Sequence, residues 1–135
     1  MKKFKATVSL VCSLAVPGVT SGCAAAALGA GAGAVGAAKY TDRGATADLK
    51  GSPLQIDQHA EKAFRDLGIK KTGSSTENSG TEQKLDGTKE DMNVSVDITP
   101  GQNGVSHVEV IAKQGTFKWN KDFAKSVLDK IVAES

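Results

Sequence analysis

Apolar residues recur at helical spacing in two segments, and each segment begins at a residue that can cap a helix. After Ser52 and Pro53, which suit a cap and a first turn, one apolar stripe consists of Ile56, Ala60, Ala63, Phe64 and Leu67. Gly68 suits a left-handed helix end. After Asn120, a second stripe consists of Phe123, Ala124, Val127, Leu128 and Ile131. The pattern predicts two amphipathic helices.

Strict alternation of apolar and polar residues predicts a β-hairpin between these helices. The first strand has its apolar positions at Met92, Val94, Val96 and Ile98, and the second has them at Val108, Val110 and Ala112. The turn-forming cluster 100–104 separates the two strands. On the second strand, His107, Glu109 and Ile111 are expected on the opposite side from the apolar row.

Weaker alternation predicts three more strands, at 45–50, 69–75 and 81–85. We expect turns at 77–80 and at Asp86-Gly87. The expected order is therefore strand, helix, four strands, helix. The corresponding fold class is α+β: a small antiparallel sheet of four to five strands with two helices packed on one face.

The N-terminus has the anatomy of an export signal. Lys2, Lys3 and Lys5 precede an uncharged, mostly apolar stretch at 6–16, and small residues lead to Cys23. The apolar stretch is shorter than the roughly 20 residues that span a bilayer, so we expect a cleaved signal peptide over 1–22.

Ser21-Gly22-Cys23 resembles the lipobox of bacterial lipoproteins, although Thr20 stands where that motif usually has Leu. The resemblance implies lipid attachment at Cys23, palmitate among its acyl chains, and a membrane partner reached through that anchor. Ala24, in place of the Asp typical of inner-membrane retention, implies the outer membrane and a periplasm-facing domain. The alternative is ordinary signal-peptidase cleavage, for example after Ala26, which would leave a soluble periplasmic protein.

An uncharged run of Ala, Gly, Leu and Val follows the cysteine over 24–38. Fifteen residues are too few for a helix across a hydrocarbon core of about 30 Å. We therefore expect a lipidated cysteine and tether over 23–43 and a folded domain over 44–135. A glycine-zipper element that self-associates in the membrane is the alternative for the Ala/Gly-rich run.

Composition narrows the classes of partner. The chain has 17 basic and 15 acidic residues, and removal of the three leader lysines leaves a net charge of about −1. This balance argues against a nucleic-acid partner. Of the two cysteines, Cys12 lies in the leader and Cys23 at the predicted cleavage site, so no disulfide is expected.

Nothing in the sequence predicts an enzyme, a cofactor site or a metal site. His59 and His107 lie on different predicted elements, without metal-ligand spacing, and we expect both on solvated surfaces. No nucleophile–base or acid–base pair can be named. Phe117 and Trp119, before the last helix, are expected to form a hydrophobic staple that closes the core, or to border a groove beside it.

The leading hypothesis is a non-enzymatic accessory or interaction module with an envelope protein as possible partner. The alternative is a binder of a small apolar ligand in a groove between the C-terminal helix and the sheet. The groove-lining candidates are Phe64, Val94, Val96, Val108, Val110, Phe123, Val127 and Leu128. These same residues would otherwise fill one another's space in a packed core.

The chain resembles one family of small bacterial lipoproteins known only as a domain of unknown function. The features that carry the resemblance are the run GCAAAALGAGAG, a helix ending in DLGIK, a strand hairpin and a closing helix with LDKI. The likeness covers nearly all of the chain from Cys23 onward. It implies a periplasm-facing lipoprotein and brings no catalytic residues with it.

Overall fold

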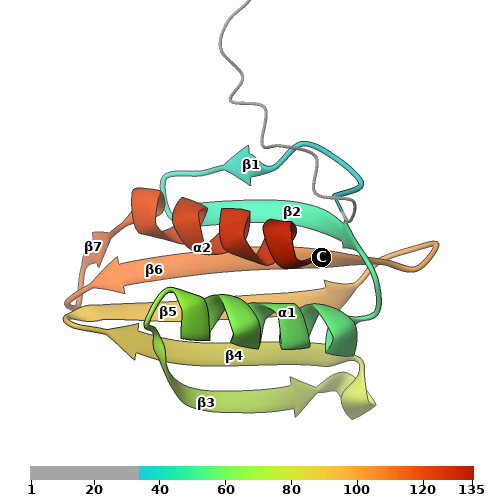
Figure 1. Ribbon diagram of the computed structural model, residues 1–135, viewed down its shortest axis with the longest axis horizontal. Coiled ribbons are helices and arrows are strands. Elements are labelled where there is room, and N and C mark those ends of the chain that lie inside the picture. Colours follow the sequence, from blue (N-terminus) through green and yellow to red (C-terminus); the bar gives the residue numbers. More distant parts are fainter. Residues whose placement is uncertain (1–33) are drawn as a thin grey trace, which may run out of the picture.

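One antiparallel sheet carries both helices on the same face (Figure 1). The computed structural model describes residues 34–135. In chain order its elements are β1 (Lys39–Tyr40), β2 (Gly44–Lys50), α1 (Pro53–Asp66), β3 (Lys70–Glu77), the 3₁₀ turn η1 (Asn78–Gly80), β4 (Glu82–Lys89), β5 (Met92–Pro100), β6 (Val105–Gln114), β7 (Lys118–Trp119) and α2 (Lys121–Glu134). The strands lie in the order β1-β2-β6-β5-β4-β3, and β7 pairs with β6.

This architecture confirms the α+β class and the two helices on one face. The sheet has seven strands where four to five were expected. The additional strands include β1 and β7, which have only two residues each. Two residues are too few to display an alternating pattern, so sequence periodicity cannot detect such strands.

Helix α1 begins and ends at the predicted residues. The Gln55 amide N–H donates to the Ser52 hydroxyl, and the Ser52 amide N–H donates to the Gln55 side chain over 3.0 Å, which completes a capping box. Gly68 adopts φ +68° directly after the C-cap residue Leu67, as a left-handed helix end requires. The buried face of α1 packs toward β4 and β5 and consists of Ile56, Ala60, Ala63 and Phe64.

Helix α2 covers the other half of the sheet, against β2 and β6. The Asn120 side chain caps it by accepting a hydrogen bond from the Phe123 amide N–H at 3.0 Å. The buried residues of α2 are Ala124, Val127, Leu128, Ile131 and Val132. No helix within residues 34–135 combines the length and apolar character needed to cross a bilayer.

The predicted β5–β6 hairpin is confirmed. Val96 pairs with Val110 and Ile98 pairs with Val108, so the two apolar rows lie side by side under the helices. Both rows are almost completely buried. The hairpin therefore forms the centre of the core, with β2 on one side and β4 on the other.

The predicted turn at Asp86-Gly87 is wrong, because β4 continues through both residues to Lys89. The side chains of Phe64 and Ile69 lie directly over Gly87: a Cβ atom built there would lie 2.7 Å from each. Glycine is therefore needed for close packing within the strand. The chain turns instead after Lys89, where Glu90 adopts φ +53°.

The final part of the predicted tether lies on the sheet. Lys39 and Tyr40 pair with β2, Ala34 forms a bridge with Leu49, and Ala38 packs against the core. The Tyr40 hydroxyl also donates to Asp129 of α2 at 3.4 Å. We expected the whole of 23–43 to stay off the fold, and for residues 34–43 this expectation is wrong. Edge pairing of this kind uses backbone groups, so it needs no apolar side chains.

Candidate functional site

The eight residues predicted to line an apolar groove form part of the core instead. Seven of them are at most 2% exposed: Phe64, Val94, Val96, Val108, Val110, Val127 and Leu128. Phe123 is partly buried and packs against the same cluster. The structure does bring these residues together, but as neighbours that fill one another's space.

Neither α1 nor α2 covers the opposite face of the sheet, and we call it the open face. Its residues on the four central strands are Thr46, Asp48 and Lys50 of β2; His107, Glu109, Ile111 and Lys113 of β6; Asn93, Ser95, Asp97 and Thr99 of β5; and Lys84, Asp86 and Thr88 of β4. Acidic, basic and hydroxyl side chains are mixed over the whole face. The alternation of the strands therefore separates one apolar face from one polar face.

The open face contains a hollow of about 440 Å³. Its lining includes Thr72, Lys84, Asp86, Ser95, Ile111 and Trp119. The hollow thus spans β3 to β6 and is bordered by the short strand β7. Its volume lies within the roughly 300–1,000 Å³ of ligand pockets, and its lining combines polar residues with Val94, Ile111 and the ring of Trp119.

Two contacts hold charged side chains in place within this hollow. The Ser95 hydroxyl donates to an Asp86 oxygen at 2.8 Å. The Lys84 ammonium group lies 3.5 Å from an Asp97 oxygen. Each contact joins neighbouring strands of the sheet, so the acceptor and donor groups of the open face are partly pre-positioned.

His107 has a partner that sequence reasoning did not find. Its Nδ1 atom lies 2.8 Å from an Asp48 carboxylate oxygen, and both side chains are about half exposed. Asp48 lies on β2, opposite His107 in the strand register. Glu109, the neighbour suggested by the sequence, lies on the same face but pairs with Thr46 and Asp97. A contact between distant strands leaves no signal in local sequence spacing.

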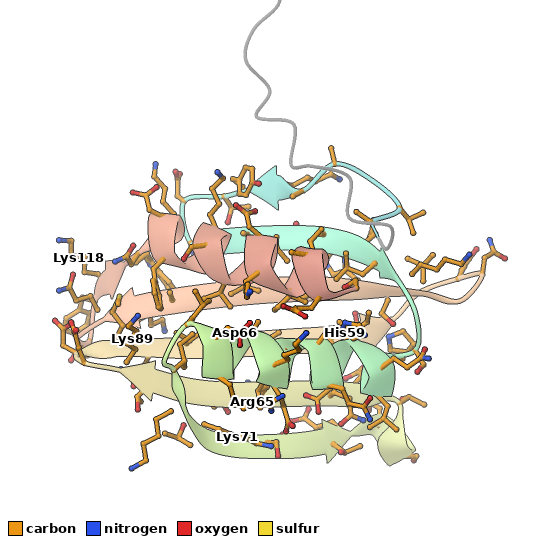
Figure 2. The ribbon with its side chains drawn as sticks, in the orientation of Figure 1. His59, Arg65, Asp66, Lys71, Lys89 and Lys118 are labelled. Atoms are coloured by element: carbon orange, nitrogen blue, oxygen red, sulfur yellow. The ribbon has the colours of Figure 1, made fainter. Side chains whose placement is uncertain are left out.

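The two histidines lie on opposite sides of the sheet. His59 is half-buried on α1 (Figure 2), whereas His107 lies on the open face. The structure therefore does not bring them together. Within residues 34–135, no group of three His, Cys, Asp or Glu side chains is placed to hold a metal ion.

The expected hydrophobic staple at Phe117 and Trp119 is wrong. Phe117 is 92% exposed and Trp119 is 36% exposed. Pairing of β7 with β6 holds this segment at the end of the sheet, away from the core. The Lys113 ammonium group lies 4.3 Å from the centre of the Trp119 ring, and Arg43 lies 5.8 Å from it. Both distances suit cation–π contacts.

Charged groups with shifted pKa values lie on the helix side of the sheet. Burial is the main cause that raises the pKa of Asp57, with repulsion from Glu61 adding to it. Asp66 of α1 and Lys130 of α2 lie 2.9 Å apart, and the hydrogen bond from Lys130 lowers the pKa of Asp66. These groups act on helix packing rather than on the open face.

Cys23, the predicted lipid-attachment residue, lies outside the described residues. Residues 5–131 match a protein family described as protein of unknown function (DUF3568). The chain belongs to this family. The DUF3568 match includes most of the leader, Cys23, the Ala/Gly-rich run and nearly all of the folded domain. No curated protein matches the chain.

Proposed function

We propose that this protein is a lipid-anchored module of the bacterial envelope that binds a partner protein and catalyses no reaction. The observation that carries the binding role is the open face with its hollow of about 440 Å³. One face of the sheet is covered by both helices, whereas the other presents polar groups, some of them held by contacts between neighbouring strands.

The leader and Cys23 support the anchoring role. The basic start, the short apolar stretch and Ser21-Gly22-Cys23 have the order found in lipoprotein precursors. The DUF3568 match extends across these segments and the domain alike, so they occur together in one family. Ala24 after the cysteine favours the outer membrane and a periplasm-facing domain.

The chemistry of the open face favours a polar protein surface as its partner. Asp97 and Glu109 pair across the β5–β6 register, while Lys84 and Lys113 lie on the flanking strand and further along β6. A partner with interspersed charges of complementary sign would satisfy them. An apolar ligand under α2 finds no support in the fold, because its eight candidate residues pack in or against the core.

The anchor is tested by metabolic labelling with palmitate. The wild-type chain should incorporate label and fractionate with the outer membrane, and Cys23→Ala should do neither. The control is Cys12→Ala, which removes the other cysteine of the chain and should keep the label on the processed protein. Equal labelling of wild type and Cys23→Ala would exclude the anchor.

The binding role is tested by photo-crosslinking in living cells. A photoreactive residue at Asn93, exposed beside the hollow, should give one discrete cross-linked species. The matched control position is Gln58, which is exposed on α1 on the other side of the molecule. Lys84→Glu should weaken the cross-link from Asn93 by reversing one charge of the surface. Cross-linking of equal strength from both positions would argue against recognition by the open face.

A further inference from the structure

An exposed aromatic segment projects from one end of the sheet, and we call residues 115–119 the aromatic tip. Phe117 is 92% exposed although the core is complete without it. Trp119 follows two residues later and is 36% exposed. A phenylalanine with almost its whole surface in water contributes no packing to the fold, and Phe117 and Trp119 together place two exposed aromatic rings within three residues of one turn.

The aromatic tip is firmly mounted. Trp119 pairs with Lys113 in the β6–β7 ladder, and the Asn120 amide N–H donates to the Ala112 carbonyl at 2.9 Å. At the start of the turn, Gly115 adopts φ +61°, and its amide N–H donates to the Asp91 carbonyl at 3.2 Å. The backbone therefore holds Phe117 outward without support from the Phe117 side chain itself.

Basic side chains surround the aromatic tip. Lys113 and Arg43 lie over the Trp119 ring, and Figure 2 shows Lys118 at the outer end of the molecule. Asp42 and Asp122 border the same region together with Lys118. Because the charges are mixed, we assign the main contribution to binding at the aromatic tip to the aromatic side chains and a smaller one to the cations.

We propose that the aromatic tip enters the headgroup region of the bilayer to which the protein is anchored. Phe117 would pass below the headgroups, Trp119 would lie at the interface, and Lys118 would face the lipid phosphates. Amphipathic aromatic rings favour that depth, and nearby cations are attracted by anionic lipids. The proposal rests on the proposed lipid anchor for its second point of attachment.

The length of chain between Cys23 and the fold permits both attachments at once. Ala34 forms a bridge with Leu49, near the end of β2 that is remote from the aromatic tip. Counted along β2 and β6 at about 3.3 Å per residue, Ala34 lies roughly 30 Å from the aromatic tip. The 34 − 23 = 11 residue steps back to Cys23 can extend over about 36–40 Å. The anchor and the aromatic tip can therefore reach one membrane surface.

Trp119 provides a direct test because it is the only tryptophan in the chain. The lipidated protein is placed in vesicles of phosphatidylethanolamine and phosphatidylglycerol, with or without brominated acyl chains, and Trp119 emission is recorded. We expect a shift to shorter wavelength and quenching by the brominated lipid. Phe117→Ser should remove most of the quenching while the protein stays attached through its lipid. The matched control is Leu54→Ser, which changes a 59% exposed apolar residue on α1 and should keep the quenching.

A second arm uses residues 24–135, which lack the leader and Cys23 and therefore carry no acyl chains, with the same vesicles. Here Phe117→Ser should lower the vesicle partition coefficient about tenfold, since burial of a phenylalanine ring is lost.

Lipidated protein that is attached but not quenched would overturn the proposal. A Trp119 shift that depends on protein concentration without vesicles would overturn it too, because a second copy would then be the partner. Quenching in the second arm together with failed palmitate labelling would retain the aromatic tip and reject the anchor.

Discussion

At the scale of single residues, the side chains of Phe64 and Ile69 leave no room for a Cβ atom at Gly87. Replacement by alanine would place a Cβ atom 2.7 Å from both Phe64 and Ile69 and 3.0 Å from the Lys70 carbonyl. Such overpacking costs about 1–3 kcal/mol. We therefore expect Gly87→Ala to lower the free energy of unfolding by that amount in urea denaturation.

Gly73 on the neighbouring strand is the matched control for this substitution. It lies opposite Asp86, and a Cβ atom there would come no closer than 4.0 Å to another group. Gly73→Ala should therefore leave stability unchanged or raise it slightly. Equal losses for both variants would mean that contact with Phe64 and Ile69 does not set the cost at Gly87.

Asp57 is a residue whose charge opposes folding. One of its carboxylate oxygens is buried without a hydrogen-bond partner among the described residues, and burial raises its pKa above 3.8. A carboxyl with a raised folded pKa binds its proton more tightly when folded, so stability falls as pH rises through that pKa. Asp57→Asn should therefore raise the melting temperature at pH 7, and the gain should disappear below the unfolded pKa.

Asp66 supplies the control of opposite sign. Lys130 holds the pKa of Asp66 below 3.8, so its contribution to stability is present above that pH and is lost as pH falls through the folded pKa. Asp66→Asn should lower the melting temperature slightly at pH 7, in the direction opposite to Asp57→Asn. If both variants shift stability in the same direction, the loss of a surface charge explains them better than burial does.

At the scale of elements, β1 makes residues 34–43 part of the fold. Removal of 34–42 would expose the edge of β2, release Ala38 from the core and break the Tyr40–Asp129 hydrogen bond. At about 1 kcal/mol for each net hydrogen bond, we expect a loss of about 2–3 kcal/mol in a chain that begins at residue 43. The measurement is thermal unfolding against a chain that begins at residue 34.

A point substitution separates the contribution of the Tyr40 side chain to stability from that of β1 pairing. Tyr40→Phe removes only the hydroxyl that donates to Asp129, in a contact that is exposed. It should cost much less than the deletion, because backbone pairing with β2 remains. A deletion no more harmful than Tyr40→Phe would show that β1 pairing contributes little, and the fold would then begin at β2.

The helices and the β5–β6 hairpin were predictable because their signals are local. Ser52 and Asn120 mark helix starts that the structure confirms, and the alternation from Met92 to Ile98 marks one strand. At Asp86-Gly87 the local signal for a turn is overridden by tertiary packing of Phe64. Asp-Gly dipeptides favour hairpin turns, but tertiary packing can override such a local preference.

The open face was only partly predictable. Alternation correctly assigned His107 and Glu109 to a polar face, since every second residue of a strand shares a side. Contacts across strands, such as His107 with Asp48, depend on register between segments far apart in the chain. The outward position of Phe117 depends on β7, whose two residues give no periodic signal.

At the scale of the whole molecule, the core and the surfaces proposed for binding are separate. The helices and the apolar face of the sheet form one continuous cluster, which contains no cysteine among the described residues. The open face and the aromatic tip lie outside that cluster. Changes at these surfaces should therefore alter binding without unfolding the domain.

Two phenylalanines test this separation. Phe64 is 1% exposed and packs in the core, whereas Phe117 is 92% exposed. Phe64→Ala should cost about 3–5 kcal/mol, because it removes a buried ring and leaves a cavity. The free energy of unfolding of a domain is typically about 5–15 kcal/mol, so that cost is a large share of it. Phe117→Ala should change unfolding in urea by less than about 0.5 kcal/mol, since exposed positions contribute little. A large loss of stability at Phe117 would mean that the aromatic tip is part of the core, and its proposed role at the membrane would have no basis.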